Sequence, residues 1–151
     1  MRVLFLLLGL NLFFPAISQE TQTPPPAILS ADDVDRFITT LKPMSEELEA
    51  LGIEADNGAN EWVTADKAVA ILEKYGWTSE TWLEKYSKIT LGFAYHAMMK
   101  VVNEMPAEQK DAADQMRAMY ETQYKAMIHP DDLKLVGDQF DRLMELGLDE
   151  K

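Results

Sequence analysis

Methionine and histidine side chains that could bind a soft metal gather in one stretch of the sequence. His96 is followed by Met98, Met99 and Met105, and thioether and imidazole groups are ligands that suit Cu(I). On a helix, however, Met98 and Met105 share one side, whereas His96 and Met99 share another. Because methionine also fills apolar cores well, we predict a packing role for these residues and no metal or other cofactor. Copper binding through them is kept as an alternative function.

The two histidines are also the main candidates for catalysis, but neither lies in a known motif. His129 directly precedes Pro130, a position from which it is predicted to cap a helix. The sequence has no H-E-x-x-H, no G-x-S-x-G and no glycine-rich phosphate loop, the patterns that build such chemistries. It has no cysteine, which excludes disulfides and thiolate metal ligands. We therefore predict a non-catalytic protein, with an enzyme of unrecognised site as a second alternative.

Acidic residues are the most abundant charged groups, and they cluster toward both ends of the predicted domain. The formal net charge is −12, which disfavours nucleic acid and anionic lipid surfaces as partners. Residues 30–56 hold eight acids and two bases, residues 129–151 hold seven and three, and residues 57–128 hold ten and eight. These acidic faces serve either solubility or the docking of a cationic partner. The candidate docking aspartates are Asp32, Asp33, Asp35, Asp131 and Asp132.

A group of aromatic residues offers a second way to bind a partner. Most of them are predicted to be core, because Trp82, Tyr86 and Phe93 are in phase on one predicted helix. Trp77 and Tyr95 are less constrained and could line a groove for an apolar ligand or a partner's helix. Through the acidic face or through this groove, we predict binding of a protein or peptide.

The element that must position most of these residues is a long helix predicted over residues 77–105. Gly92 in its interior costs about 1 kcal/mol relative to alanine, so another helix is expected to approach closely there. Large apolar side chains follow one another at steps of three or four, the spacing that places them on one buried face. These residues are Trp82, Tyr86, Ile89, Phe93, Ala97 and Val101.

The first predicted helix begins at Ser30, which can cap it, and carries an apolar heptad pattern as far as Leu51. Pro43 lies inside this pattern. Because the pattern keeps its phase on both sides of the proline, we predict a kink rather than a helix end. The apolar seam could pair within the domain or between chains, so the oligomeric state is left open.

Three further helical segments complete the predicted fold. One spans residues 61–75, and the other two open at Pro106 and Pro130. Helix ends are predicted at three apolar-Gly-apolar triplets, which are centred on Gly52, Gly76 and Gly147. The sequence thus predicts an all-α fold, a compact bundle of four to five mostly antiparallel helices organised around one long central helix.

The N-terminal part carries the features of an export signal. Residues 3–14 form an apolar run, and the small residues Ala16 and Ser18 fit cleavage after Ser18. The mature protein is predicted to be periplasmic or secreted, with no membrane insertion after cleavage, and the lack of cysteine favours a bacterial envelope. The predicted organisation is a signal peptide over 1–18, a proline-rich flexible segment over 19–29 and a single helical domain over 30–151.

Overall fold

The computed structural model describes residues 25–53 and 59–146, and all regular structure in these residues is helical. The predicted signal peptide, most of the proline-rich segment and the helix end at Gly147 lie outside the described residues. The fold is the predicted all-α bundle. Its elements in chain order are α1 (Ala31–Ala50), α2 (Ala59–Thr64), α3 (Asp66–Lys74), α4 (Ser79–Asn103), a 3-10 helix (Ala107–Gln109), α5 (Lys110–Lys125), α6 (Pro130–Asp138) and α7 (Phe140–Met144).

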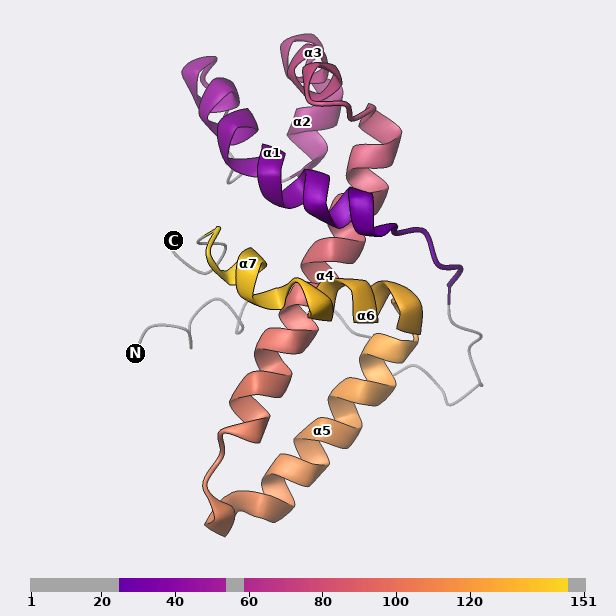
Figure 1. The fold of residues 1–151 in the computed structure, drawn as a ribbon, viewed down its shortest axis with the longest axis vertical. Helices are drawn as coiled ribbons and strands as arrows, with labels where there is room; N and C mark the ends of the chain where they lie inside the picture. The colour runs from indigo at the N-terminus through magenta and orange to yellow at the C-terminus, as the bar shows by residue number, and fades with distance from the viewer. Residues whose placement is uncertain (1–24, 54–58, 147–151) are drawn as a thin grey trace.

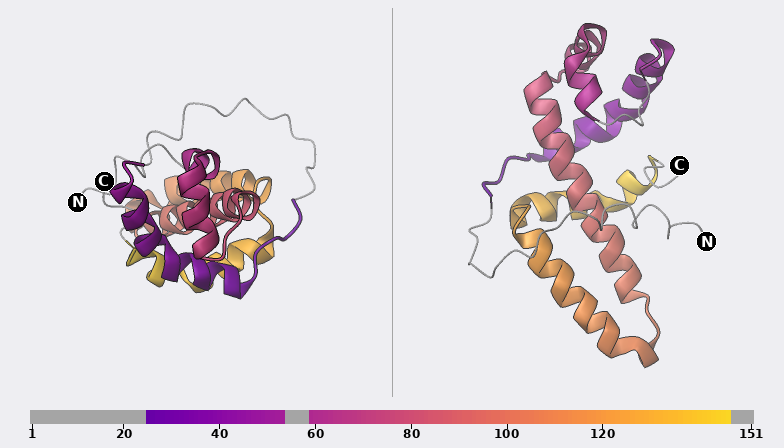
Figure 2. Two further views of the ribbon diagram at one scale, coloured as in Figure 1. Left: turned by 90° about the horizontal axis from the view of Figure 1, so that it is seen from above. Right: turned by 180° about the vertical axis from the view of Figure 1, so that it is seen from behind.

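The long helix α4 is the central element, and the other helices gather on it in three groups (Figures 1 and 2). The helices α1, α2 and α3 pack around its N-terminal half, α6 and α7 cross it near the middle, and α5 runs back beside its C-terminal half. We refer to residues 92–125 as the hairpin, because they contain the C-terminal half of α4 and all of α5. The remaining helices and the N-terminal half of α4 form the body.

The starts of α1 and α4 follow from capping side chains. Ser30 and Asp33 form a capping box at the start of α1, and Thr78 and Thr81 form one at the start of α4. Each box satisfies backbone N–H groups that have no partner inside the helix. The helix α1 continues through Pro43 without a break, and Figure 1 shows it changing direction along its length.

Two of the predicted glycine-dependent helix ends are confirmed. Gly52 and Gly76 have φ angles of 74° and 80°, in the left-handed region that glycine adopts most easily. After each glycine, the next amide bonds back to a carbonyl of the last helical turn, at 3.0 Å for Ile53 and 2.9 Å for Trp77. The chain therefore folds back sharply at both positions, as expected for this type of cap.

Two segments that the sequence predicts as single helices are each divided in two. The 61–75 segment is interrupted at Ala65, whose backbone is extended with ψ at 123°. The segment opening at Pro130 is interrupted at Gln139, which separates α6 from α7. In the first case α2 packs on α4 whereas α3 also packs on α1, so the break lets each half reach a different neighbour.

Trp82 is the centre of the body's core. Its side chain is fully buried and contacts rings from three other elements. The ring centroids lie 5.8 Å from Phe37 of α1, 5.4 Å from Trp62 of α2 and 5.4 Å from Trp77 in the turn before α4. Stacked and edge contacts of this kind add stability beyond the buried area. The prediction that most aromatic residues form the core is confirmed.

The helix α6 crosses α4 so closely that both helices carry glycine at the contact. A Cβ atom at Gly92 would lie 3.0 Å from Val136 of α6. A Cβ atom at Gly137 of α6 would lie 2.6 Å from the imidazole of His96 on α4. The close approach predicted at Gly92 is therefore confirmed. The structure shows that α6 also carries a glycine, Gly137, at this contact.

The C-terminal half of α4 corrects the prediction of one continuous buried face. Val101 is predicted to be buried, but its side chain is 41% exposed, whereas Trp82 and Ile89 on the same stripe are fully buried. The N-terminal half of α4 packs against α1, α2 and α3, whereas beyond the crossing only α5 runs alongside it among the described residues. Val101, the last residue of the stripe, therefore faces solvent past the crossing.

The crossing yields a first prediction. We expect Gly137→Ala to lower the free energy of unfolding by about 1–3 kcal/mol, because an added methyl group must displace the His96 ring. Removing that ring with His96→Ala should relieve the clash. The double variant should therefore lose less free energy of unfolding than the sum of the losses in the two single variants. Urea unfolding of the four proteins measures this coupling. Effects that add to within about 0.5 kcal/mol would contradict it.

Candidate functional site

The helices α1 and α6 begin side by side, joined by the carboxylate of Asp132. This side chain is 0% exposed and accepts hydrogen bonds from the backbone N–H groups of Ile28 at 3.1 Å and Leu29 at 2.9 Å. His129 caps α6, as predicted, since its Nδ1 accepts a hydrogen bond from the Asp131 N–H at 3.2 Å. Asp132 therefore fixes the chain that enters α1 against the first turn of α6.

A second buried carboxylate holds the start of α1 against α4. Asp33 accepts a hydrogen bond from the Ser30 N–H at 2.9 Å and pairs with the Lys85 ammonium of α4 at 2.7 Å. Burial raises the pKa of Asp33, but the hydrogen bonds from Lys85 and Ser30 more than offset this effect and hold the pKa below its ordinary value. Asp33 is thus ionised and engaged within the fold.

The other three predicted docking aspartates face solvent. Asp35 pairs with Arg142 of α7 at 2.8 Å. Asp131 lies 3.6 Å from the His129 imidazole, and Asp32 makes no ion pair with any residue in the described part of the chain. We name Asp32, Asp35 and Asp131 the acidic end. Within residues 25–53 and 59–146, Asp32 and Asp131 are the carboxylates of the acidic end that lack a lysine or arginine partner.

The two aromatic residues predicted to line a groove are placed differently from each other. Trp77 is buried in the core, where its Nε1–H donates to the Thr40 hydroxyl at 3.1 Å and the Arg36 guanidinium lies 5.2 Å from the ring centroid. Tyr95 is half-buried between α4 and α5, with its ring 5.2 Å from that of Tyr124. Trp77 is therefore unavailable to a partner, and Tyr95 mainly fills a helix junction.

The predicted copper ligands do not converge on His96. Its Nε2–H donates to the carbonyl oxygen of Leu133 in α6 at 2.9 Å, so the ring is part of the α4–α6 crossing. Met98 and Met105, two and nine residues further along the chain, fall on the opposite side by helical spacing, whereas Met99 lies on the His96 side. Because α4 is continuous over this stretch, helical spacing separates His96 from two of the three methionines grouped with it by sequence.

Within residues 25–53 and 59–146, no group of three His, Cys, Asp or Glu side chains could hold a metal ion together. In the same residues, no helix combines the length and the apolar character needed to cross a bilayer. Comparison of the chain with protein-family models, curated proteins and solved structures gives no match. Functional assignment therefore rests on the chemistry of these residues.

The two structural aspartates differ in how far their role was detectable from sequence. Asp33 stands three residues after Ser30, the spacing of a capping box, so a local signal existed. Asp132 accepts hydrogen bonds from residues 104 and 103 positions away in the chain. No local pattern can reveal such a contact, and Asp132 therefore looked like its exposed neighbour Asp131.

This pair of neighbours provides a matched test. We expect Asp132→Ala to lower the free energy of unfolding by about 1–3 kcal/mol, because two backbone N–H groups lose their acceptor in a buried site. Asp131→Ala removes a carboxylate of the same kind from an exposed position, and it should change the free energy of unfolding by no more than about 0.5 kcal/mol. Urea unfolding at neutral pH compares the two. Equal effects would show that Asp132 does not tie α6 to α1.

The lowered pKa of Asp33 makes its contribution depend on pH. A carboxylate whose pKa is depressed by folding stabilises the protein above its unfolded pKa of about 4, and this stabilisation is lost as pH falls through the folded pKa. The stability difference between wild type and Asp33→Asn should therefore be largest at neutral pH and shrink below about pH 4. Unfolding curves between pH 7 and pH 2.5 measure it, with the exposed Asp32→Asn as control. A difference that stays constant over this range would contradict the role of the Lys85 pair.

Proposed function

We propose that this chain is an exported, non-catalytic binding protein of the bacterial envelope that docks a protein or peptide through the acidic end. The observation that carries the proposal is the position of Asp32 and Asp131. Both are exposed at adjoining helix starts, and neither has a lysine or arginine partner within the described residues. Because buried Asp132 and Asp33 hold these helix starts in place, the exposed carboxylates are displayed on a rigid support.

The charge distribution favours a cationic partner. The hairpin contains five acids and four bases, whereas the whole chain has a net charge of −12, so the negative charge resides almost entirely outside the hairpin. A surface of one dominant sign steers oppositely charged molecules and raises their association rate. A segment rich in lysine or arginine is therefore the partner chemistry that fits the acidic end.

Each of the two histidines has a structural contact in the described fold. His96 donates from Nε2 to a backbone carbonyl, and His129 accepts from a backbone amide at Nδ1. Each ring thus uses one nitrogen to hold the ends or crossings of helices. For the copper-binding and enzymatic alternatives, the described residues offer no observation comparable to the exposed carboxylates of Asp32 and Asp131.

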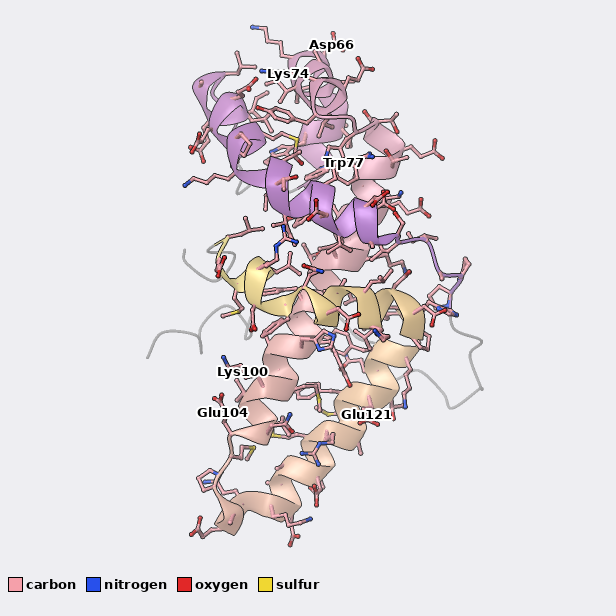
Figure 3. All side chains as sticks on the ribbon, in the orientation of Figure 1. Asp66, Lys74, Trp77, Lys100, Glu104 and Glu121 are labelled. Carbon is pink, nitrogen blue, oxygen red and sulfur yellow. The ribbon has the colours of Figure 1, made fainter. Side chains whose placement is uncertain are left out.

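The docking proposal is tested with two double variants of equal charge. Asp32→Asn with Asp131→Asn removes the carboxylates that lack a basic partner, whereas Asp66→Asn with Asp111→Asn removes two exposed carboxylates elsewhere on the molecule. Figure 3 shows Asp66 at the far end of the body. Each protein serves as bait for the native envelope fraction at 0.1 M and 1 M salt, where the Debye length falls from about 10 Å to about 3 Å.

We expect a partner that wild type and the Asp66/Asp111 variant retain at low salt and release at high salt. The Asp32/Asp131 variant should retain markedly less of the same partner. Equal retention by both variants would place the docking surface elsewhere, and no retention at either salt concentration would remove the support for a protein-binding role. Circular dichroism confirms that each bait is folded.

A further inference from the structure

One side of the hairpin carries large apolar side chains that no described helix covers. Val101 on α4 is 41% exposed and Met119 on α5 is 54% exposed, although both are apolar. The neighbouring residues on the same side are partly buried. We name this surface the hairpin face, and its members are Ala94, Met98, Val101 and Met105 together with Met116 and Met119.

Helical spacing places the α4 part of this surface away from α6. His96 points toward α6, where it contacts Leu133. Met98 and Met105 are two and nine residues after His96, which corresponds to a rotation of about half a turn in both cases. They therefore lie on the side of α4 opposite to α6.

The α5 part of the surface lies on the same side of the hairpin. Asn103, seven residues after His96, shares its side of α4 and accepts a hydrogen bond from Arg117 of α5 at 3.0 Å. Arg117 therefore marks the α6 side of α5, and Met119, two residues later, falls on the opposite side with Met116 one turn before it. Viewed from behind in Figure 2, none of the other described helices crosses this side of the hairpin.

Charge identifies what can cover the hairpin face. The hairpin holds five acids and four bases in a chain of net charge −12, so two copies that meet through their hairpins repel each other much less than two copies that meet through their acidic ends. Several of its charges are already satisfied, because Lys110 and Arg117 pair with Asp114, and Lys125 pairs with Glu121.

Two hairpin charges at the edge of α4 remain without such a partner. Lys100 and Glu104 are exposed and make no ion pair with any residue in the described part of the chain. Figure 3 shows both on the edge of α4 that faces away from α5. They carry opposite signs and are one helical turn apart, so they flank Val101 on that edge.

We propose that a second copy of this chain covers the hairpin face and that the two hairpins form a four-helix bundle about a two-fold axis. When two α4 helices pack antiparallel near Val101, Lys100 of each copy meets Glu104 of the other, and the two ion pairs are equivalent by symmetry. The apolar side chains of the two faces then bury one another, as in the core of a four-helix bundle.

The size of the surface indicates the class of interface that is expected. A helix of 16 residues such as α5 is about 24 Å long, and two helices side by side are about 18 Å wide. The area of such a face is at the small end of the interface areas seen in specific complexes. We therefore expect a dimer that forms and dissociates in the micromolar range rather than an obligate one.

The ion pairs allow a charge-swap test by sedimentation velocity between about 1 and 200 μM. Lys100→Glu and Glu104→Lys each place like charges opposite one another, so each variant alone should self-associate at least about tenfold more weakly than wild type. An equimolar mixture of the two should form a heterodimer, because every pair then joins opposite charges. The double variant Lys100→Glu with Glu104→Lys should dimerise like wild type for the same reason.

Three further variants separate the apolar contact from general effects. Val101→Glu should abolish the dimer, whereas Leu83→Glu, at a position of α4 that is 39% exposed in the body, should leave it unchanged. Lys67→Glu alters charge outside the hairpin and controls for Lys100→Glu. Circular dichroism shows whether each variant is folded.

A wild-type protein that stays monomeric at all concentrations would overturn the proposal, even if the hairpin face captured a different protein. So would a dimer that neither Lys100→Glu nor Val101→Glu weakens. The test is independent of the docking proposal, because Asp32 and Asp131 lie outside the hairpin and their variants should dimerise normally.

Discussion

The close crossing of α4 and α6 is the contact on which the arrangement of the whole molecule depends. Glycine on each helix lets the backbones approach until Gly92 meets Val136 and Gly137 meets His96. Because α6 is fixed there, its first turn comes to lie beside the start of α1, where buried Asp132 joins the two. A bulkier residue at the crossing would push α6 outward and strain that junction as well. Packing at the crossing and the hydrogen bonds of Asp132 are thus parts of one constraint.

The crossing also divides α4 into two environments. On one side, Trp82 is surrounded by aromatic rings from α1, α2 and the turn before α4, so the N-terminal half buries the face that carries Trp82 and Ile89, while Leu83 on its outer face is 39% exposed. On the other side, α4 has α5 as its neighbour, and two helices can bury only the stripe where they touch. Apolar residues on the remaining surface, such as Val101 and Met119, stay exposed. An uncovered apolar face in an acidic protein is stable in solution only while it is small, and a face of this kind commonly marks an interaction site.

Sequence was sufficient for most of the fold because its signals are local. Ser30 and Thr78 cap helices, Gly52 and Gly76 end them, and Gly92 indicates a close helix contact; each of these depends on residues within one or two turns. The burial of Val101 was predicted wrongly because periodicity shows which residues share a face but not whether a neighbouring helix covers it. The same limitation applies to the acidic end. Asp131 and Asp132 are equivalent in sequence, and only a contact with a segment about a hundred residues away distinguishes them.

The separation of charge between body and hairpin lets the two proposed surfaces act together without competing. Carboxylates that stabilise the fold, Asp33 and Asp132, are already engaged, so the charge available to a partner is smaller than the net charge suggests. The carboxylates that we propose for docking lie in the body, whereas the hairpin is nearly neutral. A two-fold dimer formed through the hairpins would therefore carry two acidic ends that remain free. A partner with two cationic segments could bind both at once, and the second contact would benefit from the high effective concentration created by the first. Weak docking at each end would then suffice for tight binding of a bivalent partner, provided that its segments span the distance between the two bodies.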